Sequence, residues 1–222
     1  MFIWLKKSKP LSRKNYTPEA VYEKRWYILG VLCLSLLVVM IGNTSLNVAL
    51  PVLSQELRAS NSQLQWLVDS YSLVFAGFLF TAGAIGDRYG RKGIMQAGLV
   101  LFGLASAAAA FMVHSADALI AVRAVMGLAG AMIMPATLSI LINVFPTKER
   151  ARAVGIWAGI SGAGIALGPL LTGYILQHFT WHAVFLINIP IILIALVSGA
   201  ILVPRTSDPS HTNLDPVGAG LS

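Results

Sequence analysis

Two ionisable side chains lie deep inside long apolar segments of this chain, and together they could handle a proton. Asp69 and Arg123 each fall a few residues inside such a segment. A charge at the centre of a bilayer costs about 2.5–3.5 kcal/mol on insertion scales, so each needs a reason to be there. Because burial favours a protonated carboxyl group and a nearby arginine favours the ionised form, Asp69 is the candidate proton-binding group and Arg123 its regulator. The alternative is a static ion pair between them that locks two helices.

Asp69, Arg123 and Asn43 share one depth in their segments. At 1.5 Å per residue, Asp69 and Arg123 lie roughly 8 Å below the outer end of their helices, and Asn43 reaches a similar layer. We therefore expect a cavity in the outer half of the molecule. Methionine and aromatic side chains suit lipophilic cations there, although at helical spacing they more often serve plain packing. The further candidates for this substrate cavity are Asn47, Tyr71, Met126 and Trp157.

The apolar segments that position these residues are long enough to cross a membrane. The chain is 56% hydrophobic and 11% charged, with a mean hydropathy of +0.74, whereas a soluble domain carries about 25% charged residues. A helix needs about 20 apolar residues to span a bilayer. Six segments qualify, and their short connections predict an all-α membrane protein, a bundle of six antiparallel transmembrane helices. They lie near residues 27–50, 64–83, 93–113, 118–144, 153–179 and 183–203.

The positions of lysine and arginine predict the orientation of this bundle. Apart from Arg58 and Arg123, all of them lie in residues 1–26, in the loops after the second and fourth segments, or in residues 204–222. Loops rich in these residues face the cytoplasm. We therefore expect both termini in the cytoplasm, with residues 1–26 as a basic tail, in a multi-pass protein of the inner or plasma membrane. The positive charge then reflects topology and contact with the lipid bilayer, and no nucleic-acid partner.

A polar, glycine-containing string connects the second and third segments. In GAIGDRYGRK, residues 83–92, Asp87 can bond backbone N–H groups or the neighbouring arginines, and Gly90 relieves the turn. The string resembles the second-to-third loop motif of the major facilitator superfamily, which implies a cytoplasmic latch against the other half of a transporter. A simple positive-inside anchor is the alternative, but it accounts only for the cations. The matching residues are Gly83, Asp87, Arg88, Gly90, Arg91 and Lys92.

The fifth segment resembles the motif that separates antiporters from other members of this superfamily. Small residues there permit close helix packing, and Pro169 favours a kink. The residues that match are Gly155, Gly164, Gly168, Pro169 and Gly173, while Thr172 replaces a glycine. In the fourth segment, Arg123, Gly127 and Gly130 resemble the family's intramembrane arginine motif.

Further strings are similar to the 14-helix drug:proton antiporter branch of the superfamily. They are NTSLNVALP at 43–51, QWLVDSYSL at 65–73 and FLINIP at 185–190. Asn43 stands where that branch commonly has an aspartate. The Asn43 amide cannot take up and release a proton during a transport cycle. Either Asp69 alone would couple transport to protons, or the stoichiometry or substrate range would differ, or the protein would be inactive. Trp181-His182-Ala183 replaces the usual Trp-Arg-Trp, and His178 and His182 either sense pH near the outer surface or are loop residues without partners.

The resemblance implies the N-terminal half of a proton-coupled exporter of drugs or other small lipophilic or cationic compounds. The superfamily moves two six-helix bundles about a central site, and residues 204–222 resemble a linker and the start of a seventh helix. A missing C-terminal half or a second copy is therefore an expected partner. No cofactor is implied, and the sequence shows no catalytic cluster and no metal-spaced His or Cys, so we expect no enzyme. The alternative is an inactive or accessory half-transporter with a structural role in the membrane.

Overall fold

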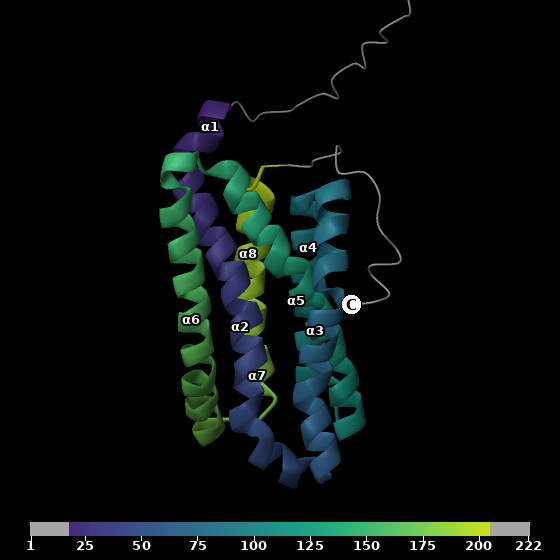
Figure 1. Cartoon of the computed structure of the whole chain (residues 1–222). Coiled ribbons are helices and arrows are strands. Elements are labelled where there is room, and N and C mark those ends of the chain that lie inside the picture. Colours follow the sequence, from purple (N-terminus) through teal and green to yellow (C-terminus); the bar gives the residue numbers. More distant parts are fainter. Residues whose placement is uncertain (1–17, 205–222) are drawn as a thin grey trace, which may run out of the picture.

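The computed structural model describes residues 18–204, which fold into helices with no strand in that range (Figure 1). Residues 1–17 and 205–222, which hold most of the basic tail and the expected start of a seventh helix, lie outside the described residues. The helices are α1 (Pro18–Glu23), α2 (Arg25–Glu56), α3 (Asn61–Tyr89), α4 (Arg91–Phe111), α5 (Ala116–Val144), α6 (Thr147–His178), α7 (Ala183–Leu186) and α8 (Asn188–Leu202).

Six helical units of the described range are long and apolar enough to cross a membrane, which confirms the predicted six-helix, all-α architecture. The sixth unit, Ala183–Leu202, consists of α7 and α8 together. The helices reach beyond the apolar segments that predicted them: α3 continues to Tyr89 instead of ending near residue 83, and α6 begins at Thr147 instead of near residue 153. Backbone hydrogen bonding continues past the hydrocarbon boundary, because polar residues there form helix as readily as apolar ones.

Polar caps fix where α3 and α5 begin. The Ser60 hydroxyl accepts a hydrogen bond from the Gln63 backbone N–H at 3.3 Å, and the side-chain Oε1 of Gln63 accepts one from the Ser60 backbone N–H at 3.0 Å. At the start of α5 a single bond forms the cap, in which the Ser115 hydroxyl accepts from the Ala118 backbone N–H at 3.3 Å. Both caps lie at the same end of the bundle, so Asp69 and Arg123, at similar distances along the chain from their caps, lie at similar depth.

The two central helices are α2 and α5. Within their most apolar stretches, 67% of α2 and 56% of α5 is buried, against 17% for α3 and for α6. The helix α3 packs along α5, α6 packs along α2, and α8 packs against α2 and α4 (Figure 1). As a result α3 and α6 keep faces that nothing in the described part of the chain covers.

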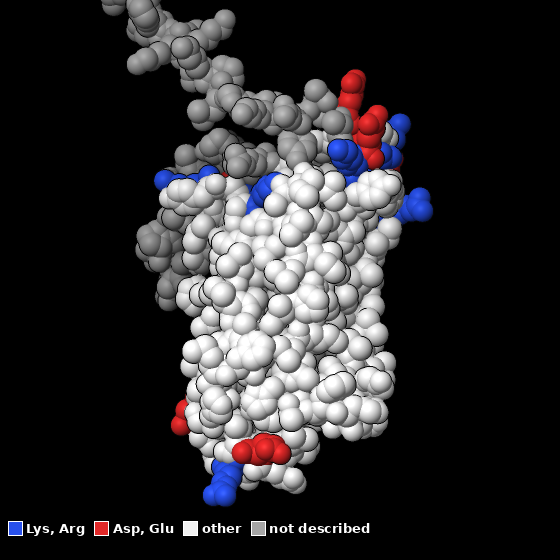
Figure 2. Space-filling view, turned by 180° about the vertical axis from the view of Figure 1, so that it is seen from behind, with Lys and Arg blue, Asp and Glu red and all other residues white. Residues whose placement is uncertain are grey.

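Most charged side chains visible in Figure 2 lie at one end of the bundle, a few lie at the opposite end, and the middle of this face carries none. We call this the basic end; the opposite end, where α2 ends and α3 begins and where Arg58 lies, is the distal end. The basic end is defined by Lys24, Arg25, Arg88, Arg91, Lys92, Lys148, Arg150 and Arg152. The antiparallel order of the helices brings these residues together, as the sequence predicts. The cytoplasmic orientation of this end stays a prediction.

Candidate transport site

Arg123 is the most buried charged residue of the described chain, and backbone carbonyl groups hold it. Its side chain is fully buried in α5. The Nε–H donates to the Leu67 carbonyl oxygen at 3.1 Å, and Nη1 donates to the Gly42 carbonyl oxygen at 2.7 Å. The guanidinium group also lies 4.4 Å from the centre of the Tyr71 ring. Arg123 therefore ties α5 to α2 and α3, and its Nη2 has no hydrogen-bond partner among residues 18–204.

Asp69 lies at the depth of Arg123 but does not pair with it. No ion pair joins the two side chains, and Asp69 is half-buried while Arg123 is fully buried. The reason is angular. Residues two positions apart on an α-helix point to nearly opposite sides. Because Leu67 and Tyr71 contact Arg123, Asp69 between them points away. The static ion pair considered as an alternative is therefore not the arrangement in this structure.

The predicted cavity residues fall into two groups. Tyr71 and Met126 belong to the packed interior, where the Tyr71 hydroxyl donates to the Val39 carbonyl oxygen at 3.1 Å. Trp157 is also buried, and its Nε1–H donates to Thr137 Oγ1 at 3.3 Å. Asn43 is half-buried and Asn47 is exposed. A substrate cavity lined by these five residues stays a prediction.

The glycines that follow Arg123 on α5 allow α3 to approach closely. A Cβ atom added at Gly127 would overlap the Tyr71 carbonyl oxygen and would lie 3.1 Å from Tyr71 Cα. One added at Gly130 would lie 3.0 Å from the Tyr71 hydroxyl and 3.1 Å from Phe75. In the sequence, Gly127 and Gly130 stood out only through a resemblance to a family motif. These contacts give the physical reason for glycine at both positions. They also keep Tyr71 under the Arg123 guanidinium group.

The motif at the basic end forms a one-residue turn. Gly90 has a φ of +123°, a conformation that side chains disfavour, and it separates the last residue of α3 from the first of α4. Asp87 accepts hydrogen bonds from Arg91 Nε at 2.6 Å and from the Ser139 hydroxyl at 3.2 Å. Because Ser139 belongs to α5, Asp87 joins three helices. Most of the predicted loop is therefore helical, and Asp87 bonds the neighbouring arginine, as expected.

The remaining residues of this motif have separate contacts. Gly83 packs against Pro135 of α5, since an added Cβ would lie 3.6 Å from Pro135 Cβ. The Arg88 guanidinium group lies 5.4 Å from the centre of the Tyr89 ring. Lys92 Nζ donates to the carbonyl oxygens of Ala200 and Val203, both at 2.7 Å. Lys92 thus binds the C-terminal end of α8, where a cation is favoured.

Only part of the glycine motif in α6 is used for packing inside the described chain. Gly164 and Gly168 are buried against α2, where Cβ atoms would meet Met40 and Thr44 respectively. Added Cβ atoms at Gly155 and Gly173 would meet nothing within 4 Å. The motif therefore has one side against α2 and another side open. Pro169 lies within α6, which continues as one helix to His178.

Two contacts at the basic end had no clear signal in the sequence. Arg25 and Glu149 form a two-pronged ion pair, with Nε–Oε2 at 2.7 Å and Nη2–Oε1 at 3.1 Å, which joins the starts of α2 and α6. The other is the bond from Lys92 to the end of α8. Both connect residues more than 100 positions apart. The sequence contained only general hints of them. For Lys92, the hint was that cations are favoured near helix C-termini; for Arg25 and Glu149, it was that segments at the same end of the bundle carry opposite charges.

Six apolar spanning helices, with a fully buried arginine among them and a charged turn at one end, are typical of helical membrane transporters. The family model of the Major Facilitator Superfamily matches residues 32–220, and the chain belongs to that family. It is therefore a multi-pass membrane protein of a transporter family, and its similarity is to transporters and not to enzymes.

Named relatives and a solved structure are similar to this chain. "Multidrug efflux pump LfrA" of Mycolicibacterium smegmatis is 44% identical over 90% of this chain and 40% of its own length. "Methyl viologen resistance protein SmvA" of Salmonella typhimurium is 46% identical over 82% of this chain and 37% of its own length. The chain thus spans about two fifths of these relatives. A structure of the proton:xylose symporter XylE has a TM-score of 0.73 and 16% identity, covering 82% of this chain and 45% of that one, which shows the shared fold.

Proposed function

We propose that this chain is the N-terminal half of a proton-coupled exporter of small lipophilic or cationic compounds. The observation that carries the proposal is the 44% identity to a multidrug efflux pump over 90% of the chain. The name of the second relative, a resistance protein for the aromatic dication methyl viologen, supports a cationic substrate. The buried Arg123 and the half-buried Asp69 supply the ionisable groups that coupling to protons needs.

Asp69 is the proposed proton carrier, and Arg123 organises the helices around it. Arg123 binds the Leu67 carbonyl oxygen, two residues before Asp69 on the same helix. A change of charge at Asp69 therefore acts on a segment of α3 that is held to α5 and α2 by one guanidinium group. With Asp69 ionised, its side chain needs water or a cation; with Asp69 protonated, the cost of burial falls. That difference can couple proton binding to movement of α3.

The open faces of α3 and α6 are the proposed contact surface for a second bundle, and this partner can be a C-terminal half or a second copy. Both helices are mainly uncovered, with 17% of their most apolar stretches buried. Asp69 lies on the α3 side that Arg123 does not occupy, and the open side of the α6 glycine motif would let another helix approach. Asp87, held by Arg91 and Ser139, is the proposed centre of the latch at the basic end.

A chimera tests this proposal. Residues 1–203 would replace the matching part of the M. smegmatis efflux pump, and ethidium efflux from cells would be measured with and without a proton uncoupler. We expect uncoupler-sensitive efflux. If the unmodified pump exports ethidium and the chimera, present in the membrane at the same level, does not, then this half lacks the proposed function and the inactive or accessory alternative holds.

A further inference from the structure

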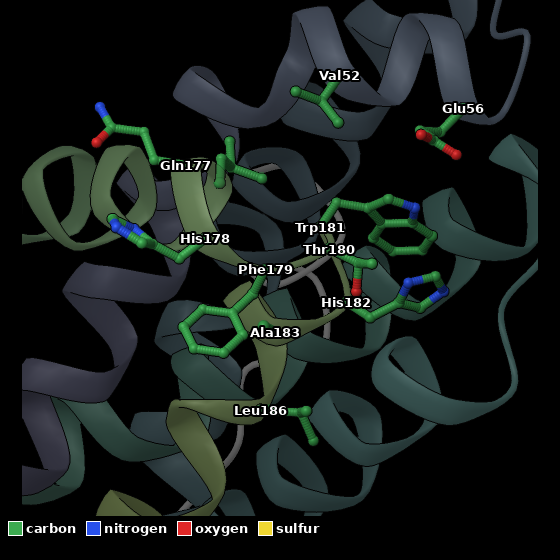
Figure 3. Close-up of a pocket in the computed structure, with 11 residues that line it drawn as sticks. Val52, Glu56, Gln177, His178, Phe179, Thr180, Trp181, His182, Ala183 and Leu186 are labelled. Carbon is green, nitrogen blue, oxygen red and sulfur yellow. The ribbon is translucent and has the colours of Figure 1, made fainter.

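A cavity of about 730 Å³ lies at the distal end of the bundle, away from the residues that the proposed function uses (Figure 3). It falls within the range of about 300–1,000 Å³ that small-molecule sites occupy. Its walls come from the last turns of α2 and α6, the loop between α6 and α7, and α7 itself. It includes none of the predicted proton-coupling or substrate-cavity residues.

The electrostatics of this cavity favour a cation. Glu56 is the one carboxylate that lines it, and neither lysine nor arginine is among the lining residues of the described chain. Two long helices end at its wall, α2 at Glu56 and α6 at His178. The last carbonyl groups of a helix lack intrahelical partners and carry a partial negative charge, which favours cations. The opposing amino end belongs to α7, a helix of a single turn.

The same cavity offers aromatic surface. Figure 3 shows Trp181 and His182 on one side, with Glu56 above them, and His178 and Phe179 on the other side. Trp181 is buried, and its ring stacks on His182 with centroids 3.7 Å apart. Phe179 is 64% exposed, so its face is free to cover a ligand. Aromatic faces attract cations, and the attraction adds to the carboxylate.

We infer that this distal cavity is a binding site for flat aromatic cations, held by Glu56 and Phe179. The titratable groups that face the cavity are Glu56 from α2, His178 from α6 and His182 from the loop; α7 contributes Ala183 and Leu186, which carry no charge.

In the loop position of His182, an arginine would carry a permanent positive charge and would repel a cation. Binding at this site needs neither a proton gradient nor a second bundle. The inference therefore goes beyond the proposed function and would still hold if the transport proposal failed.

Ethidium binding to the purified 222-residue chain tests the site. The chain would be placed in nanodiscs of zwitterionic lipid, and fluorescence anisotropy at pH 8 would be corrected with empty nanodiscs. We expect saturable binding that Glu56→Gln weakens by about three- to fivefold, the size of a partly exposed charge pair. Phe179→Ala should weaken it as well, while Glu19→Gln, the same change at an exposed carboxylate in α1, should leave it unchanged.

The proposal is overturned if no saturable binding occurs, or if Glu56→Gln and Glu19→Gln have equal effects. Loss of the fold in a variant shows in its far-UV circular dichroism, and the remaining variants still decide.

Discussion

The close approach of α3 and α5 at Gly127 gives a prediction whose sign can be worked out from the structure. A Cβ atom at this position would overlap the Tyr71 carbonyl oxygen and press on the Tyr71 backbone. A backbone atom in a helix cannot turn aside as a side chain can. Overpacking of this kind costs about 1–3 kcal/mol, while alanine gains up to about 1 kcal/mol over glycine in helix propensity. We therefore expect Gly127→Ala to lower the free energy of unfolding by roughly 1–2 kcal/mol.

Gly159→Ala is the matched control, because an added Cβ there meets nothing within 4 Å. It should leave stability unchanged or raise it by up to about 1 kcal/mol. Thermal unfolding in detergent, followed by far-UV circular dichroism, measures both. For a chain of this size each kcal/mol moves the midpoint by roughly 2–4 °C, so Gly127→Ala should melt about 2–8 °C lower and Gly159→Ala no lower than wild type. Equal midpoints for the two variants would refute the packing argument.

A pair of double-mutant cycles with Tyr71→Phe distinguishes a clash with the Tyr71 backbone from a clash with its side chain. At Gly130 the nearest obstacle is the Tyr71 hydroxyl, 3.0 Å from an added Cβ. Tyr71→Phe should therefore partly rescue Gly130→Ala but should not rescue Gly127→Ala. Each is compared with the cost of Tyr71→Phe alone, which loses the hydrogen bond to Val39. Rescue of both glycine variants, or of neither, would contradict the contacts described here.

Three further predictions concern the basic end. Asp87→Asn should reduce efflux by the chimera while lowering stability by less than about 1 kcal/mol, because the ion pair with Arg91 is partly exposed; a loss of folding would contradict this. Lys92→Met should speed amide hydrogen exchange in the last turn of α8, where its Nζ binds two carbonyl groups, and exposed Lys148→Met should not. Glu149→Gln should lower stability slightly at low salt, because it breaks the ion pair with Arg25, and the difference should shrink at 1 M salt, where charges are screened within about 3 Å.

The sequence predicted how deep Asp69 and Arg123 lie in the bundle better than it predicted the directions in which their side chains point. Counting residues from the helix starts placed Asp69 and Arg123 in the same layer, and the caps at Ser60 and Ser115 support that placement. The direction in which each side chain points depends on how α3 is rotated against α5. That rotation is set by packing at Tyr71 and Gly127, contacts between helices that hydropathy along one chain does not contain. The pair therefore looked possible from depth alone, and the structure shows each residue with different neighbours.

For the motif at the basic end, too, the sequence predicted some features and not others. Its charge pattern and Gly90 were enough to predict a tight turn and a bond between Asp87 and a neighbouring arginine. The helical continuation to Tyr89 was missed because polar residues at a membrane surface look like a loop when only hydropathy is read. The distal cavity was also outside the reach of the sequence, since its walls come from segments more than 100 residues apart. Only the unusual His182 gave a local signal there.

The role of Asp69 as proton carrier can be measured as proton release on substrate binding. The purified chimera and its Asp69→Asn variant would be mixed with ethidium in weakly buffered solution containing a pH-sensitive dye, with ethidium titrated into empty detergent as the blank. We expect proton release from the chimera and none from the Asp69→Asn variant, which should still bind ethidium. Equal proton release from both proteins would contradict the assignment of Asp69 as the proton carrier.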